Sequence, residues 1–371
     1  MNNLDITHFL GRLLLEPLLA PPPEKIQNWL RKSLEWEKII EVASENLITP
    51  ALYSSFCSLN IFHALPDDLQ GYLTEIHLCN AQRNLEIKEQ VLQIASCLNK
   101  IGVEPLFLKG VANLFYEIYP DPGDRIMSDA DILVPKEKLL ECVQVLKGED
   151  YYSVYDESLF NGKSHHYIPL ISDRKQAAVE LHQYSVPQPY NCLYSEEEFW
   201  ALSIVKSVKN TSFRLPSPLD HIKHHIIHAH KHNGVYGMSK YLLRGLYDFM
   251  LLCRKFEAHI NWSLLEASFT QAGFRKAFVF YLLAVDKFCG YQEPLHHVEI
   301  RNTERLYVHW MNLYFQYPEL LALWKLFAHY RQACSEIASD QEKRKEFLEK
   351  LKNRQIYVRH AKIIVRCFSQ D

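Results

Sequence analysis

Apolar residues in the first hundred positions recur at three-and-four spacing, which is typical of amphipathic helices. The pattern runs through Trp29, Leu30, Leu34, Trp36, Ile39, Ile40, Val42 and Ala43. A longer helix is predicted from about residue 80 to residue 100, and Gly102 ends it as a left-handed C-cap glycine does. Residues 1–98 are therefore predicted to form an N-terminal helical region.

After Gly102 the pattern changes to short apolar runs that are separated by turn residues. Residues 105–108 are apolar and end abruptly at Lys109-Gly110, as a buried strand does. Further strands are predicted at 129–134, 151–155, 167–171 and 177–184, and helices at 111–119 and 135–147. The mixture of strands and helices over residues 99–215 predicts an α+β core, a small mixed sheet with flanking helices.

From about Pro218 onward the pattern is helical again, so residues 216–371 are predicted to be a C-terminal helical domain. Residues 340–354 are rich in charge and are interpreted as a solvated helix face. Residues 343–366 combine an excess of Lys and Arg with apolar positions, which indicates a basic amphipathic helix. Such a face is either solvated or contacts RNA or another polyanion.

Composition narrows the choice of partners. The 371 residues carry 41 Lys and Arg against 44 Asp and Glu, a formal net charge of -3, so no long nucleic acid is expected. Nine cysteines without a Cys-x-x-Cys pair indicate reduced thiols and a cytoplasmic location. Residues 9–20 are apolar but contain Arg12 and Glu16, which favours a short amphipathic helix over a signal peptide. No run reaches the roughly 18 apolar residues of a membrane span, so no membrane partner is expected.

Two carboxylates stand two residues apart on a predicted strand. Asp129 and Asp131 therefore emerge on one face, while Ala130 and Ile132 point to the other. Magnesium prefers such hard oxygen ligands and retains several waters or phosphate oxygens. A carboxylate pair at a strand edge thus suits a metal–nucleotide complex.

A third carboxylate, Glu180, lies between Val179 and Leu181 on another predicted strand. A charged side chain in such a strand needs a partner or a metal ion. Three carboxylates can hold two ions roughly 3.5 to 4 Å apart, one activating the attacking oxygen and one the leaving group. We therefore predict that Asp129, Asp131 and Glu180 are catalytic and bind metal, two Mg²⁺ ions with Mn²⁺ as an alternative.

A phosphate contact is predicted where the first strand meets a helix, at Lys109-Gly110. Backbone N–H groups at a helix start point toward an anion, and a glycine lets phosphate approach closely. Lys109 would add a positive charge, and Arg125 in the following loop would add a planar fork of donors. The alternative for Lys109 is a surface lysine whose stem covers apolar residues.

The order of these features resembles the polymerase-beta nucleotidyltransferase superfamily, and within it the uncharacterised nucleotidyltransferase-like group. The resemblance rests on Leu108-Lys109-Gly110, on Arg125 to Val134, on Val179-Glu180-Leu181-His182, on His224 and His228, on Leu243 to Asp248, and on Asn261-Trp262. It covers about residues 80 to 290. One position departs from the broad superfamily, because Gly110-Val111 stands where Gly-Ser or Gly-Gly is usual.

The resemblance implies a metal-dependent transfer of a nucleoside monophosphate (NMP) from a nucleoside triphosphate (NTP), with release of pyrophosphate. The acceptor would be a hydroxyl or amine on a small molecule, a protein or a tRNA end. The departure at Gly110-Val111 leaves open a catalytically inactive relative that binds nucleotide or a partner protein.

Six histidines crowd into residues 221–232. Pairs such as His224 and His228 are one helical turn apart, a spacing that zinc sites use. A His-rich metal hydrolase is therefore a rival, although the chain lacks His-Glu-x-x-His, and a packed helix is the simpler interpretation.

His182 is either a partner of Glu180 or structural. Arg244 and Asp248, also one turn apart, predict an intrahelical ion pair.

Overall fold

The computed structural model describes residues 2–18, 35–153, 155–160, 162, 164–232, 242–306, 309 and 313. Its contacts divide the chain into two units, residues 1–232 with 241–300, and residues 233–240 with 301–371. All elements named below belong to the first unit. The helices predicted around Trp29 to Leu34 and over residues 340–366 lie outside the described residues.

The core of this unit is one mixed sheet of seven strands in the order β3-β4-β5-β2-β1-β7-β6. The strands are β1 (Leu106–Phe107), β2 (Asp129–Leu133), β3 (Tyr152–Ser153), β4 (Leu170–Ile171), β5 (Ala178–His182), β6 (Ile204–Val208) and β7 (Thr211–Leu215). β2 runs parallel to β5, and β1 parallel to β7, whereas the other pairs are antiparallel. The α+β class with a small mixed sheet is thus confirmed, although the hairpin of β6 and β7 was not predicted.

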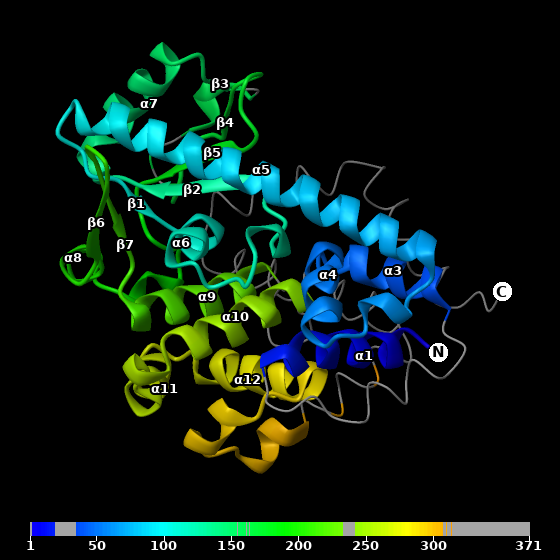
Figure 1. Cartoon of the computed structure of the whole chain (residues 1–371). Coiled ribbons are helices and arrows are strands. Elements are labelled where there is room, and N and C mark those ends of the chain that lie inside the picture. Colours follow the sequence, from blue (N-terminus) through cyan, green and yellow to red (C-terminus); the bar gives the residue numbers. More distant parts are fainter. Residues whose placement is uncertain are drawn as a thin grey trace, which may run out of the picture. The chain divides into compact units, whose positions relative to one another are not determined.

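Helices flank the sheet (Figure 1). Their bounds are α1 (Asn3–Leu15), α3 (Trp36–Glu45), α4 (Thr49–Ser58), α5 (Asp67–Asn99), α6 (Lys109–Tyr116), α7 (Leu139–Gly148), α8 (Glu196–Ala201), α9 (Pro218–His232), α10 (Leu243–Lys255), α11 (Trp262–Gln271) and α12 (Arg275–Cys289). None of the described helices is long and apolar enough to cross a membrane.

Helix α5 is the longest of the described elements, with 33 residues, and begins well before the residue 80 that was predicted. Leu69 and Leu73 extend its buried apolar face toward the N-terminus. It packs along α4 at one end and near α7 and β7 at the other, so one rigid rod spans the helical region and the sheet (Figure 1). At the centre of the sheet, Ala130 and Ile132 of β2 are fully buried, as the alternation predicted.

A row of polar side chains on the buried face of α5 holds the loops that lead into the central strands. The Asn80 amide donates to the carbonyls of Gly123 (2.7 Å) and Arg125 (3.0 Å), and Asn84 donates to the Arg125 carbonyl (2.7 Å). Gln90 donates to the carbonyl that precedes β5, at Ala177 (2.9 Å). Because buried amide groups need partners, these bonds fix where β2 and β5 begin. Polar residues at helical spacing on the otherwise apolar face of α5 were the sequence signal that could have revealed this role.

The helices at the two ends of the described chain pack together. α1 contacts both α10 and α12, and α9 contacts α10 and α12. Ile6, Phe9 and Leu10 of α1 and Phe278 of α12 are at most 1% exposed. Each such side chain contributes about 1.5 to 3 kcal/mol through burial, so this layer is a stable support for the sheet.

Asp124 is a buried acid at the end of the loop that α5 holds. It is 2% exposed, and neither carboxylate oxygen has a hydrogen-bond partner of normal geometry. Asp121 is an acidic neighbour, and the Nδ1 atom of His77 lies 3.7 Å from Asp124 Oδ1. Burial raises the pKa of Asp124 from its ordinary value of 3.8 to about 7. The folded protein therefore favours the neutral acid.

We expect the stability of the protein to fall as pH rises from about 4 to 7, because the unfolded chain ionises Asp124 before the folded chain does. The loss from this group is about 4 kcal/mol at most. In Asp124→Asn the side chain cannot ionise, so its melting temperature should depend less on pH. The measurement is thermal melting of both proteins between pH 4 and 8, with Asp173→Asn on an exposed loop as control. Parallel melting curves for wild type and Asp124→Asn would contradict the prediction.

Candidate active site

Asp131 and Glu180 lie side by side at the centre of the sheet. β2 and β5 are parallel, and their register pairs Asp131 directly with Glu180. Asp131 is 3% exposed, while Glu180 is half-buried. Two carboxylates that are far apart in sequence are therefore held on the same face of neighbouring strands.

His182 lies next to both acids, two residues after Glu180 on the same strand. Its Nε2 atom is 2.9 Å from Asp131 Oδ1 and 3.6 Å from Glu180 Oε2. An ionised carboxylate can only accept, so Nε2 donates to Asp131. Each of the three side chains offers a ligand atom within 4.8 Å of the others, and the buried Nδ1 of His182 has no hydrogen-bond partner. The group Asp131, Glu180 and His182 is hereafter the acidic centre.

Lys109 brings a positive charge to the acidic centre. It is the first residue of α6 and has a left-handed backbone with φ of 47°, which is unusual for a residue with a side chain. The Leu108 N–H donates to the Asp131 carbonyl at 3.0 Å, so the chain is anchored beside Asp131 as it turns. From there the Lys109 Nζ donates to Asp131 Oδ1.

The charges in the acidic centre stabilise one another. Burial alone would raise the pKa of Asp131, but the Lys109 ammonium and the His182 hydrogen bond hold it well below its usual value. The contact with His182, whose Nε2 lies 3.6 Å from Glu180 Oε2, lowers the pKa of Glu180 as well. Burial alone would lower the pKa of Lys109, yet the charge and hydrogen bond of Asp131, together with the charges of Glu180 and Asp129, outweigh it and raise the pKa. At neutral pH the centre thus holds two carboxylates and one ammonium.

Asp129 stands apart from this arrangement. It precedes Asp131 by two residues on β2, is paired in register with Ala178, and accepts from Ser128 Oγ at 3.2 Å. Its charge raises the pKa of Lys109, though less than Asp131 and Glu180 do. Of the three predicted metal ligands, the structure brings Asp131 and Glu180 together and adds His182. The metal-binding role of Asp129 stays a prediction.

A side chain at Gly110 would crowd Met127. A Cβ atom at this position would lie 2.6 Å from Met127 Sδ, so the missing side chain makes room for Met127. The close approach of phosphate that was predicted at Gly110 stays a prediction, and it would use the backbone N–H groups of α6 rather than this space.

Arg125 is held in a buried ion pair. Its Nε lies 2.9 Å from Asp248 Oδ2 on α10, and the Tyr119 hydroxyl donates to Asp248 Oδ1 at 2.9 Å. The phosphate contact predicted for Arg125 would therefore require a change of partner. The intrahelical pair expected between Arg244 and Asp248 is not what the structure shows, because Asp248 pairs with Arg125 while Arg244 donates to the Ile126 carbonyl at 3.2 Å.

The histidines of α9 are mostly packing residues. His221 Nε2 bonds to Asn113 Oδ1 (2.6 Å), and His225 Nε2 lies 2.8 Å from the Tyr281 hydroxyl. Burial lowers the pKa of His224 to about 3, so its Nε2 donates to the Ser185 carbonyl (2.9 Å) as a neutral ring. Among the described residues, the acidic centre is the only group of three or more His, Cys, Asp or Glu side chains close enough to share a metal ion.

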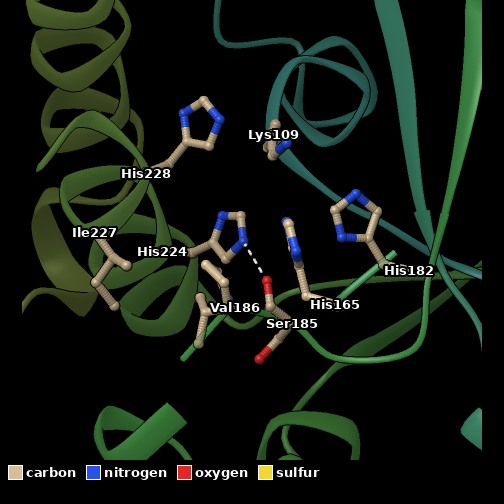
Figure 2. Close-up of a pocket in the computed structure, with 9 residues that line it drawn as sticks. Lys109, His165, His182, Ser185, Val186, His224, Ile227 and His228 are labelled. Carbon is tan, nitrogen blue, oxygen red and sulfur yellow. Dashed lines mark hydrogen bonds between the residues drawn. The ribbon is translucent and has the colours of Figure 1, made fainter. Parts of the chain in front are cut away.

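A small pocket opens beside the acidic centre, between β5 and α9 (Figure 2). Its empty volume is about 260 Å³, open solvent at the mouth included. The lining residues are Lys109, His165, His182, Ser185, Val186, Pro187, His224, Ile227 and His228. Figure 2 shows His224 and His228 across the pocket from His182, with Lys109 at the edge. Sequence patterns missed this pocket because it joins two elements that are far apart along the chain.

Comparison with known proteins adds the family. No curated protein matches the chain. Among solved structures, the chain is similar to the crystal structure of an antigenic nucleotidyltransferase-like protein from Paracoccidioides brasiliensis, with 16% sequence identity and a TM-score of 0.34. That match covers 57% of this chain and 97% of the other. Residues 32–290 match the family described as uncharacterised nucleotidyltransferase, so the chain belongs to that family.

Proposed function

We propose that the protein transfers an NMP from an NTP to a hydroxyl or amine acceptor and releases pyrophosphate. The observation that carries the proposal is the pair Asp131 and Glu180 on adjacent parallel strands, with Lys109 against them, in a chain of this family. In this reaction the acceptor oxygen or nitrogen forms a bond to the α-phosphorus while the bond to pyrophosphate breaks.

The acidic centre fits a divalent cation. Two carboxylates supply hard oxygen atoms, and His182 adds a nitrogen within 4.8 Å of them. Oxygen ligands suit Mg²⁺, and an imidazole nitrogen also suits Mn²⁺. When bound, two such ions would activate the attacking group and neutralise charge on the leaving pyrophosphate. Asp131 and Glu180 would hold them, and Asp129 would contribute from its place two residues along β2.

The remaining side chains have roles that follow from their contacts. Before metal binds, His182 holds the Asp131 carboxylate through its Nε2 hydrogen bond, which keeps the acid oriented and ionised. As a metal ligand, the same nitrogen would give up this hydrogen bond. Glu180 is more exposed than Asp131, and we propose that it accepts the proton of the acceptor group. Lys109 and the backbone N–H groups that begin α6 at Gly110 would contact the phosphates.

The direct test is to incubate the protein with each of the four NTPs, labelled at the α-phosphate, together with Mg²⁺ or Mn²⁺ and cell lysate. We expect label on an acceptor, in the lysate or on the protein itself, and release of pyrophosphate. Absence of both with every NTP and either metal would rule the proposal out. A reaction without added metal, in the presence of a chelator, would contradict the role of the acidic centre.

A second candidate is a catalytically inactive relative that binds nucleotide or a partner protein. The observation in its favour is Gly110, whose open side is filled by Met127, in a chain with valine where the superfamily usually has serine or glycine. Calorimetric titration with NTP and Mg²⁺ separates the two candidates, because binding without turnover favours the inactive relative. The His-rich hydrolase gains no support from His221, His224 and His225 of α9, which are hydrogen-bonded to protein groups.

A further inference from the structure

The Lys109 ammonium contacts the carboxylate of Asp131 in the acidic centre. It donates to Asp131 Oδ1, the same oxygen that accepts from His182 Nε2. The carboxylates of Glu180 and Asp129 also stabilise its charge. The lysine side chain is only 17% exposed, so the ammonium lies among the carboxylates rather than in solvent.

We propose that Lys109 is an internal counter-ion of the acidic centre, which a divalent cation must displace, and that the displaced ammonium then binds the phosphates of the nucleotide. This inference rests on the proposed function and adds to it that metal and triphosphate bind together. Metal alone has to compete with Lys109, whereas a metal–triphosphate complex supplies the ammonium with a new partner.

Electrostatic repulsion explains why the Lys109 ammonium and a divalent metal ion cannot share the acidic centre. A monovalent and a divalent charge about 4 Å apart repel strongly, and the repulsion grows at a buried site where water screens poorly. Asp131 is 3% exposed and its Oδ1 already accepts two hydrogen bonds. The acidic centre therefore accommodates divalent metal only if the ammonium moves away.

The structure provides a place for the displaced ammonium. Lys109 lines the pocket beside the acidic centre, and none of the nine lining residues carries a carboxylate (Figure 2). An ammonium that turns into this pocket leaves its acidic partners and meets neutral groups such as His224. It would be available there for phosphate oxygens, which it binds as a point charge.

The left-handed backbone of Lys109 supports a functional role for this side chain. A non-glycine residue with φ of 47° carries strain, and such strain is typically retained at functional sites. Glycine would relieve the strain, yet it would leave the acidic centre without its counter-ion. The lysine is therefore explained by its contact with Asp131 rather than by the geometry of the turn.

Calorimetric titration with Mn²⁺ tests the proposal. Lys109→Met should bind Mn²⁺ roughly tenfold more tightly than wild type, within the range of ordinary coupling between sites. Wild type should bind the complex of Mn²⁺ with inorganic triphosphate more tightly than Mn²⁺ alone, and Lys109→Met should lose much of this preference. Lys109→Arg retains the charge and should resemble wild type. Lys147→Met, which removes a lysine paired with Glu157 on the surface, should leave both affinities unchanged.

A second measurement uses wild-type protein and does not depend on folding of the variant. Reductive methylation followed by mass spectrometry should show greater modification of Lys109 with saturating Mn²⁺ than without metal, and less modification when triphosphate is added as well, because the displaced ammonium then binds phosphate. Equal or weaker Mn²⁺ binding by Lys109→Met, or unchanged methylation in wild type, would overturn the proposal while leaving metal-dependent transfer intact. Failure of Mn²⁺ to bind either protein would overturn both.

Discussion

Asp131→Asn is expected to abolish NMP transfer, with a loss of roughly 10² to 10³-fold or more, the range for removing one electrostatic contact to a transition state. Asparagine keeps the shape of the side chain but removes the charge that would hold the metal ions. The measurement is incorporation of α-labelled NMP by equal amounts of wild type and variant. Unchanged incorporation by Asp131→Asn would refute the proposed function.

The same assay decides which side chains hold the metal. If Asp129 is a ligand, as the sequence predicts, Asp129→Asn should lose as much activity as Asp131→Asn. If the acidic centre supplies the ligands, His182→Ala should lose more than Asp129→Asn, because His182 belongs to the centre and Asp129 does not. Asp173→Asn on an exposed loop is the control, and circular dichroism of each variant shows whether the fold is kept.

Asp248→Ala is expected to destabilise the protein by about 3 to 5 kcal/mol, the cost of leaving a buried charge without its partner. Arg125 pairs with Asp248 at 2.9 Å, and both side chains are mostly buried. The Tyr119 hydroxyl would lose its acceptor in the same variant. The measurement is the free energy of unfolding from urea denaturation of wild type and variant.

A double variant separates the charge from the packing. Arg125→Met with Asp248→Leu replaces the ion pair by apolar side chains, so it should cost less than the sum of the two single changes. Glu141→Gln breaks an exposed pair with Lys138 and should change the free energy of unfolding by less than about 1 kcal/mol. A loss for Asp248→Ala as small as that of Glu141→Gln would show that the buried pair does not contribute to stability.

The buried pair also ties the helical layer to the loop that precedes β2. Arg125 lies in that loop, Asp248 lies on α10, and Arg244 of α10 donates to the Ile126 carbonyl. From the other side, Asn80 and Asn84 of α5 bind the Arg125 carbonyl. The start of β2, and with it the position of Asp131, is therefore fixed by helices on two sides. We expect Asp248 variants to affect activity through this loop as well as stability.

Local patterns in the sequence were enough to predict the strands that carry the chemistry. Alternation in residues 129–133 placed Asp129 and Asp131 on one face of a strand, and the same alternation placed Glu180 on a face opposite Val179 and Leu181. Periodicity predicted a helix over about residues 80–100, although α5 begins earlier. These features depend on the direction of side chains along one element, which is a property of the local backbone.

Only the tertiary structure decided which of these residues meet. The parallel register of β2 and β5 brings Glu180 and His182 to Asp131, and it depends on pairing across some fifty residues of chain. The same holds for Arg125, which Asp248 engages from a distant helix, and for Lys109, which turns back onto Asp131. Which charged groups pair depends on their distance in space and on burial. Neither is encoded in the spacing of residues along one element.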